Sequence, residues 1–490
     1  MTRDRPNVFL VVMDTARART VFGDEAVMPN LHALAAEGLV CERAFSTAPW
    51  TLPSHASLFT GQYTGAHETH GGTKRFDPDV PTLAERLRAV GYQTAGFSNN
   101  PWVSPAFGFD RGFDEFRVSW KLFGGGADTG AIALESEGLG EQLSAVGKRL
   151  FRRGGHRTLL NAAYAKLLHG RHDDGARMTN WRIRRWLDRH RDPDTPFFVF
   201  VNYLEPHLEY EPPGDHYERF LPDGVDRATA AQVNQDAWSY VCGKEEMDEE
   251  DFEVLRGLYR GELAYLDRRI GEIRDYLEAA GELDETLILI AGDHGENIGD
   301  HGLMDHQYCL YDTLLHVPLV VRHPDRFPVG DRFDGLVELR DVVPTVLETA
   351  GVEAPTAETA SSRSIQRHLD EGGREHVIGQ YVTPQPPIEV LGKRVGELPE
   401  SVRRYDRALR AVRTDRWKLI EGSDRSVELY DVTSDPDERH DVSASHPDVV
   451  DRLGSLMDEE VGPLEEVTQE DDGEMRSGVE SRLEDLGYLQ

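Results

Sequence analysis

The sequence predicts an α/β fold, a three-layer sandwich in which helices cover both faces of a mostly parallel central sheet. Two observations lead to this prediction. Apolar runs of strand length, rich in Val, Ile and Phe, occur at residues 6–14, 195–204 and 285–295. Segments with helical periodicity lie between these runs, and strands that alternate with helices favour a parallel sheet in a layered fold.

The elements are expected in a definite order. PNVFLVVMD, TPFFVFVNYL and ETLILIAGDHG are the strands, and NLHALAAEGL (30–39), TLAERLRAVGY (82–92) and RMTNWRIRRWLDRH (177–190) are the helices. In this architecture ligands bind beyond the carboxyl ends of the strands. The polar residues expected at those ends are Asp14, Glu205, His207, Asp293 and His294.

Three parts are expected along the chain. Residues 1–374 form a catalytic α/β domain with an irregular, Gly-rich insertion at about 120–175. Residues 375–465 form a smaller α+β subdomain, because HVIGQYV, ALRAVRTDRWKLIEG and VELYDV predict a short antiparallel sheet before a helix. Residues 466–490 are an acidic linker and a short helical tail.

The composition is strongly acidic. The formal net charge is −34, and only 7 of the 54 basic residues are Lys. Such a surface argues against nucleic-acid binding and favours a halophilic protein from a high-salt cytoplasm, although an ordinary acidic protein has the same sign. No apolar run is long enough to span a membrane and no signal peptide is recognisable, so a cytoplasmic location is expected.

Residues 286–312, TLILIAGDHGENIGDHGLMDHQYCLYD, concentrate His and Asp side chains. Adjacent Asp293 and His294 at a strand end can reach one cation, which predicts a metal or anion site. Asp14 is the natural third ligand, although an Asp at a strand end also caps turns.

The stretch APWTLPSHASLFTG predicts a short helix that begins near Thr51, with Pro53 in its first turn and Gly61 at its end. Thr51 then has two interpretations. Its hydroxyl caps the helix, or it is a nucleophile that a bound cation activates beside the helix N-terminus.

Several motifs together resemble the sulfatase family of the alkaline phosphatase superfamily. They are NVFLVVMD, MPNLHALAAEGLVCERAFSTAPWTLPSHASLFTG, GYQTAGF, YLEPH, AYLDRRIGEI, AGDHGENIGDHG, LYDTLLHVPLVV, RDVVPTVLETAG and RAVRTDRWKLI with VELYDV, spread over residues 6–460. The resemblance implies an alkaline-phosphatase-like fold and the hydrolysis of sulfate or phosphate esters.

Two departures from the family pattern change the expected chemistry. Well-known sulfatases carry Cys-x-Pro-x-Arg, whose Cys or Ser becomes formylglycine, whereas this chain has Thr51, which cannot yield that aldehyde, and His55 in place of the arginine. The usual N-terminal acidic pair is reduced to Asp14 and Thr15. The pattern instead resembles the threonine-nucleophile branches, such as lipoteichoic acid synthases and nucleotide pyrophosphatases.

The resemblance implies a role for each matching residue. Asp14, Asp293 and His294 would hold one divalent ion (Mn, Zn or Ca), and Thr51 would be both nucleophile and fourth ligand. His207 and His306 would bind the anionic oxygens or protonate the leaving group, although His207 also suits a turn before Pro212 and Pro213. Weaker substrate-binding candidates are His55, Asn99, Asn100, Glu205 and His301, and Glu205 or His301 could also serve a second metal.

A sulfatase-like hydrolase of small-molecule or glycan esters is the expected function. Three alternatives stay open: a phosphoglycerol or phosphoryl-alcohol transferase, a phosphodiesterase or phosphonate hydrolase, and a non-catalytic binding protein on this fold. The sequence has no signal for the natural alcohol or for the oligomeric state.

Overall fold

The computed structural model describes residues 5–119, 173–215, 217–352 and 362–464. Its centre is a nine-stranded sheet of order β11-β2-β10-β6-β1-β5-β3-β4, with β9 paired to β2. β1 (Asn7–Met13) lies between β5 (Phe197–Tyr203) and β6 (Thr286–Gly292) and is parallel to both. These three strands are buried along their whole length, which explains why they are continuous apolar runs. All three predicted strands are confirmed.

The outer strands make the sheet mixed. β3 (Gln93–Ser98) and β4 (Glu115–Val118) continue the parallel arrangement beyond β5. On the other side β10 (Leu319–Arg322) is antiparallel to β6 and to β2 (Leu39–Phe45), while β11 (Asp331–Glu338) is parallel to β2. An apolar run does not reveal its direction, so the sequence pattern could not identify β10 as the exception.

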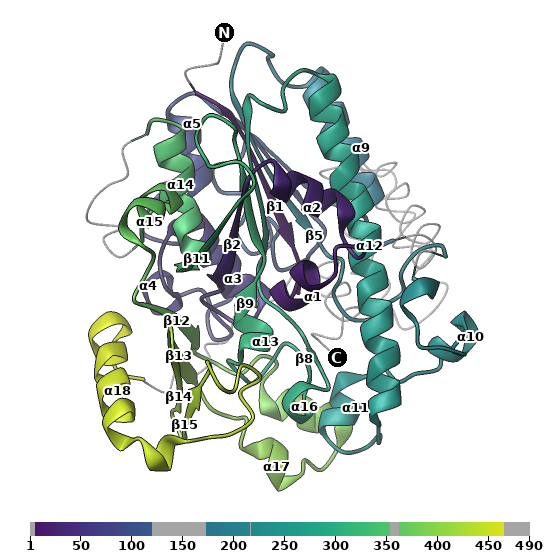
Figure 1. Cartoon of the computed structure of the whole chain (residues 1–490), viewed down its shortest axis with the longest axis vertical. Coiled ribbons are helices and arrows are strands. Elements are labelled where there is room, and N and C mark those ends of the chain that lie inside the picture. Colours follow the sequence, from purple (N-terminus) through teal and green to yellow (C-terminus); the bar gives the residue numbers. More distant parts are fainter. Residues whose placement is uncertain (1–4, 120–172, 216, 353–361, 465–490) are drawn as a thin grey trace, which may run out of the picture.

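Helices cover both faces of this sheet (Figure 1). α2 (Pro29–Ala36), α9 (Ala176–Arg189) and α12 (Glu249–Ala279) pack on the face that carries Phe9 and Val11. α3 (Thr51–Thr60), α5 (Leu83–Ala89) and α14 (Val342–Thr349) pack on the face that carries Val8 and Leu10. The predicted three-layer α/β sandwich is therefore confirmed, with one apolar cluster on each side of the sheet.

A second sheet follows the first along the chain. β12 (His376–Tyr381), β13 (Leu409–Thr414), β14 (Trp417–Gly422) and β15 (Val427–Asp431) pair antiparallel in that order. α18 (Pro447–Val461) packs on it over a separate apolar cluster, at the lower left of Figure 1. This is the predicted antiparallel sheet and helix.

The remaining elements are short. They are α1 (Ala18–Gly23), α4 (Thr64–His67), β7 (Asn297–Ile298), β8 (Met304–Asp305), α10 (Arg227–Ala230), α11 (Ala237–Val241), α13 (Asp312–Leu315), β9 (His316–Val317), α15 (Ile365–Glu371), α16 (Ile388–Val395) and α17 (Glu400–Arg403). Most of the expected insertion, residues 120–172, and the expected tail lie outside the described residues. Within the described ranges, no helix is both long and apolar enough to cross a bilayer.

Candidate active site

Two neighbouring strand ends bring three candidate ligands together. Met13 at the end of β1 is paired with Gly292 at the end of β6, so Asp14 and Asp293 leave the sheet side by side. One ligand atom from each of Asp14, Asp293 and His294 lies within 4.8 Å of the other two, and all three residues are buried. Parallel strand ends form such convergent sites because they share one edge of the sheet.

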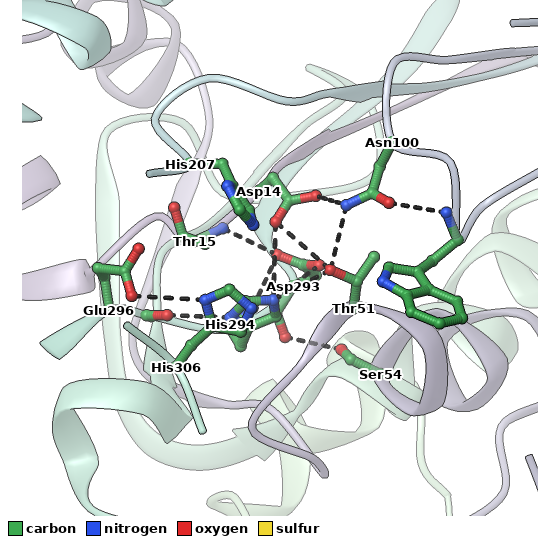
Figure 2. A network of polar contacts seen from close by, with 12 residues as sticks. Asp14, Thr15, Thr51, Ser54, Asn100, His207, Asp293, His294, Glu296 and His306 are labelled. Carbon is green, nitrogen blue, oxygen red and sulfur yellow. Dashed lines mark hydrogen bonds and ion pairs between the residues drawn. The ribbon is translucent and has the colours of Figure 1, made fainter. Parts of the chain in front are cut away.

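The hydroxyl of Thr51 belongs to this cluster (Figure 2). Thr51 Oγ1 lies 3.3 Å from His294 Nε2 and 3.5 Å from Asp14 Oδ1, and it accepts a hydrogen bond from Asn100 Nδ2 at 3.2 Å. Trp50 occupies the N-cap position of α3 and no side chain caps the helix. The capping interpretation of Thr51 is therefore wrong, because its side chain points to the carboxylates and the imidazole instead.

α3 is held rigidly in place. All ten of its residues are buried, and Gly61, in the left-handed conformation (φ 78°), ends it as predicted. The Ser54 hydroxyl donates to the backbone carbonyl of Asp293 at 2.7 Å, which ties the first turn to the end of β6. The N-terminus of α3 therefore lies at the cluster and favours negative charge there.

The two carboxylates of the cluster have raised pKa values. Burial raises the pKa of Asp14 to about 6, although Asn100 donates to its Oδ2 at 2.6 Å. Burial and the neighbouring charge of Asp14 raise the pKa of Asp293 well above its usual range. Asp293 Oδ1 accepts from two backbone N–H groups, whereas Oδ2 is buried and has no hydrogen-bond partner among the described residues. Such a site has free acceptor capacity for a positive ion.

His294 directs an unprotonated ring nitrogen toward the carboxylates of Asp14 and Asp293. Its Nδ1 lies 2.9 Å from the carbonyl oxygen of Gly295, where only a donated N–H fits, so the lone pair is on Nε2. Burial and the positive charge of His306 lower the pKa of His294 well below its usual range. Nε2 lies 3.6 Å from Asp14 Oδ1 and 3.4 Å from Asp293 Oδ2, the arrangement that a metal-ligating imidazole needs.

His207 and His306 border the cluster, as the sequence predicted. The His306 ring lies 4.5 Å from the ring of His294 and 5.1 Å from that of His207. The carboxylates of Asp305 and Glu296 lie 2.6 and 3.4 Å from His306 Nδ1. Burial acts to lower the pKa of His306, but these two carboxylates raise it well above its usual range, so the ring is an imidazolium.

Two other predicted residues border the cluster without contacting Thr51 Oγ1, and His55 Nδ1 lies 3.5 Å from Asp293 Oδ2. His55 Nδ1 donates to the Thr51 carbonyl oxygen at 2.9 Å, and its ring packs edge-on against Phe200. Burial lowers the pKa of His55 to about 4, so it is neutral. Asn99 accepts a hydrogen bond from Thr179 on α9. Both residues support the backbone of the site, whereas the neighbouring Asn100 enters it directly.

Glu205 and His301 are not brought to the cluster. Among the described residues, neither side chain has a polar contact with Thr51 or with the three candidate ligands. Glu205 is buried, and burial followed by the charges of Asp173 and Asp174 raises its pKa well above the usual range. The His301 ring stacks on Tyr311 with centroids 3.6 Å apart.

Sequence reasoning missed Glu296. It lies only two positions after His294, but it points to His306 ten residues further on, and only the antiparallel pairing of β7 with β8 closes that distance. An acidic residue directly after the Asp-His-Gly stretch was the one available signal.

The fold and the site define the class of protein. The family model described as Sulfatase matches residues 6–352, well over half of the chain, and the chain therefore belongs to the sulfatase family. Members of this family are ester hydrolases that bind a divalent metal ion.

Relatives and solved structures agree with this assignment. An arylsulfatase of Clostridium perfringens is 24% identical, over 77% of this chain and 82% of its own length. A phosphonate monoester hydrolase of Agrobacterium radiobacter superposes with a TM-score of 0.67 at 22% identity, covering 93% of this chain and 96% of that one. A structure solved with its substrate, D-glucosamine-2-N,6-O-disulfate, gives a TM-score of 0.64 at 19% identity, covering 94% and 98%. The two structures support the alkaline-phosphatase-like fold.

Proposed function

We propose that this chain is a metal-dependent ester hydrolase in which Thr51 is the nucleophile. The observation that carries the proposal is the position of Thr51 Oγ1 within 3.5 Å of both Asp14 Oδ1 and His294 Nε2, at the N-terminus of a buried helix. A hydroxyl held there has no role in capping α3. The same position is where an activated oxygen would attack a bound anionic ester.

Asp14, Asp293 and His294 fit a divalent cation. The donor set is two carboxylates and one imidazole, and the unpartnered Asp293 Oδ2 supplies a free ligand atom. Mixed oxygen and nitrogen donors suit Mn²⁺ or Zn²⁺ better than Ca²⁺, which prefers oxygen ligands. When bound, such an ion lowers the pKa of a coordinated hydroxyl and stabilises negative charge on the transferred group.

The chain's own residues would then carry the reaction. Asn100 orients Thr51 Oγ1, which would pass its proton to Asp14 Oδ1, 3.5 Å away, as it bonds to the phosphorus or sulfur atom of the ester. The bond from that atom to the alcohol oxygen breaks, and the departing alkoxide takes a proton from His306. Water then attacks the same central atom and gives a proton to the now neutral His306. The bond from that atom to Thr51 Oγ1 breaks, and the proton held by Asp14 returns to Thr51 Oγ1 as the acid leaves.

The residues at positions 51 and 55 favour phosphorus esters over sulfate esters. A formylglycine hydrate expels sulfate by collapsing to its aldehyde, whereas a Thr51 ester has to be attacked at the central atom. His55 is neutral and donates from Nδ1 to the Thr51 carbonyl oxygen, so it does not supply the positive charge of an arginine. Phosphate monoesters, phosphate diesters and phosphonate esters are therefore the proposed substrates, with sulfate esters as the slower class.

The test is turnover of aryl phosphate, phosphonate and sulfate esters with Mn²⁺ or Zn²⁺ added. Thr51→Ala is expected to lower kcat by at least about 10³-fold, because the covalent route is lost. Thr60→Ala is the matched control, since it removes a buried threonine hydroxyl at the other end of α3. It should keep kcat within about twofold. Full turnover by Thr51→Ala would contradict the proposal.

We also propose that the protein is adapted to high salt. The formal net charge of −34 makes the folded chain repel itself in dilute buffer, and salt screens that repulsion over about 3 Å at 1 M. The melting temperature should therefore rise from low to molar KCl. A flat or falling melting temperature would contradict adaptation to salt.

A further inference from the structure

A second cavity lies between the segment that carries His306 and the C-terminal sheet. Its volume is about 170 Å³. One wall comes from residues 301–311, and the other comes from the residues after α17 and from β13, β14 and β15, which lie near one another in Figure 1. Six side chains give it its chemical character: His301, Tyr308, Tyr311, Arg404, Tyr405 and Arg407.

Aromatic rings form flat walls in this cavity. Tyr308 and Tyr405 are stacked, with ring centroids 5.6 Å apart and planes 13° apart. His301 and Tyr311 form the other stack, at 3.6 Å and 14°. A cavity of about 150 Å³ accommodates benzene, so this one has room for a single six-membered ring. Flat aromatic faces favour a planar or near-planar ring as ligand.

The polar groups of the cavity favour a negative charge. Arg404 is exposed and donates from Nη2 to the Tyr405 hydroxyl at 3.0 Å. Arg407 pairs through Nη1 with Asp424 at 3.1 Å, whereas its Nε is buried and has no hydrogen-bond partner among the described residues. The one carboxylate in the lining, Glu428, is engaged by the Tyr311 hydroxyl at 2.8 Å and lies 3.9 Å from Arg407 Nη2. Arg407 is therefore shared with two carboxylates, Asp424 and Glu428, whereas Arg404 donates to a neutral hydroxyl and is the cation available to an anionic ligand.

The backbone around the cavity is strained. His301 and Tyr308 have φ values of 56° and 65°, in the left-handed region that bulky residues avoid. Each such residue costs about 1–3 kcal/mol, and they concentrate at binding and catalytic sites. Both rings that this strain positions line the cavity, which indicates that their placement serves binding.

We propose that this cavity binds a monocyclic carboxylate, with its ring against the tyrosines and its carboxylate on Arg404 and Arg407. The ligand is one six-membered ring with a single anionic group, either an aromatic acid or a sugar acid. A guanidinium–carboxylate pair would give Arg407 Nε the hydrogen-bond partner that it lacks among the described residues. It would also use Arg404, which is exposed and lines the cavity. The proposal does not depend on ester hydrolysis by Thr51.

Calorimetric titration of the full-length Thr51→Ala protein with benzoate and with D-glucuronate tests it, since this variant removes turnover from the measurement. Saturable binding with a Kd of about 1 mM or tighter is expected for one of the two. Binding of benzoate would identify an aromatic acid, and binding of D-glucuronate would identify a sugar acid. Binding of neither acid would overturn the proposal.

Arg404→Ala tests the location of the site, and Arg403→Ala is its matched control, because both arginines are exposed neighbours and only Arg404 lines the cavity. Arg404→Ala should weaken binding about tenfold, since a charge-assisted contact is lost. Arg403→Ala should leave the Kd within about twofold. Equal affinity in the two variants would also overturn the proposal.

Discussion

Two buried polar clusters flank α3, and they differ in charge balance. The ligand cluster at its first turn consists of Asp14, Thr51, Asp293 and His294. The arginine cluster beyond its end consists of Tyr63, Glu338, Arg340, Asp341 and Arg374. Both are almost fully withdrawn from water, but only the second contains as many cations as anions.

The arginine cluster satisfies its own charges. Arg340 donates to Glu338 Oε2 at 2.6 Å and to the Tyr63 hydroxyl at 2.8 Å. Arg374 donates to Asp341 through Nε at 2.9 Å and through Nη2 as well. Although burial acts to raise the pKa of Asp341, the Arg374 charge holds it far below the usual range.

The ligand cluster does the opposite, because burial raises the pKa of both Asp14 and Asp293 and the charge of Asp14 raises that of Asp293 further. Equal burial therefore has two outcomes. A neutralised cluster joins elements of the fold. Here Tyr63, between α3 and α4, donates to Glu338 at the end of β11, and the backbone N–H of Ile378 on β12 donates to the same carboxylate. A cluster with excess negative charge is complementary to a cation from solution.

Breaking the balanced cluster should have the largest effect on stability. Arg340→Ala leaves the buried Glu338 carboxylate without its main cation, so the free energy of unfolding should fall by about 3–5 kcal/mol. Chemical denaturation measures this change. Arg332→Ala is the control, because Arg332 pairs with Glu42 on the surface and should cost less than about 1 kcal/mol. Equal losses would show that the buried arginine cluster contributes no more to stability than a surface ion pair.

Neutralising one aspartate in each cluster should have opposite effects in metal-free protein. Asp341→Asn should destabilise by about 3 kcal/mol, because Arg374 loses its buried partner. Asp293→Asn should be neutral or stabilising by about 1 kcal/mol, because it removes one of two repelling carboxylates. Melting curves in a metal chelator measure both changes. A large loss in Asp293→Asn would show that the ligand cluster is balanced after all.

The stabilisation provided by a divalent cation should depend on pH. The pKa of Asp14 is raised on folding from 3.8 to about 6, so the metal-free fold loses stability as pH rises through that window. Cations compete with the same protons. The gain in unfolding free energy on adding Mn²⁺ or Zn²⁺ should therefore be about 2 kcal/mol larger at about pH 7.5 than at about pH 4.5.

Thermal melts with and without the cation at both pH values measure this difference. Asp14→Asn should reduce the pH dependence, since one of the two carboxylates with a raised pKa is gone and Asp293 remains. A cation effect of the same size at both pH values would contradict an uncompensated Asp14.

Particular residues show which parts of the fold and of the candidate site could be predicted from the sequence. β1, β5 and β6 were predictable because buried parallel strands are continuous apolar runs, and Asp14, Asp293 and His294 were predictable because polar residues come directly after those runs. Glu296 was not, since its partner His306 depends on the pairing of β7 with β8. His301 lies in the same His-rich segment as His294, yet its backbone directs it to Tyr311 and the second cavity.

The sequence by itself determined the strands, the helices and the chemical types of the ligands, because these depend on local periodicity and on the residues at the end of each strand. Only the tertiary structure decided which side chains face one another. Thr51 is the clearest case, since the same position at the start of α3 is compatible with a cap or a nucleophile. The neighbouring ends of β1 and β6 place two carboxylates and an imidazole beside its hydroxyl, and that long-range geometry, not the local sequence, excludes the cap.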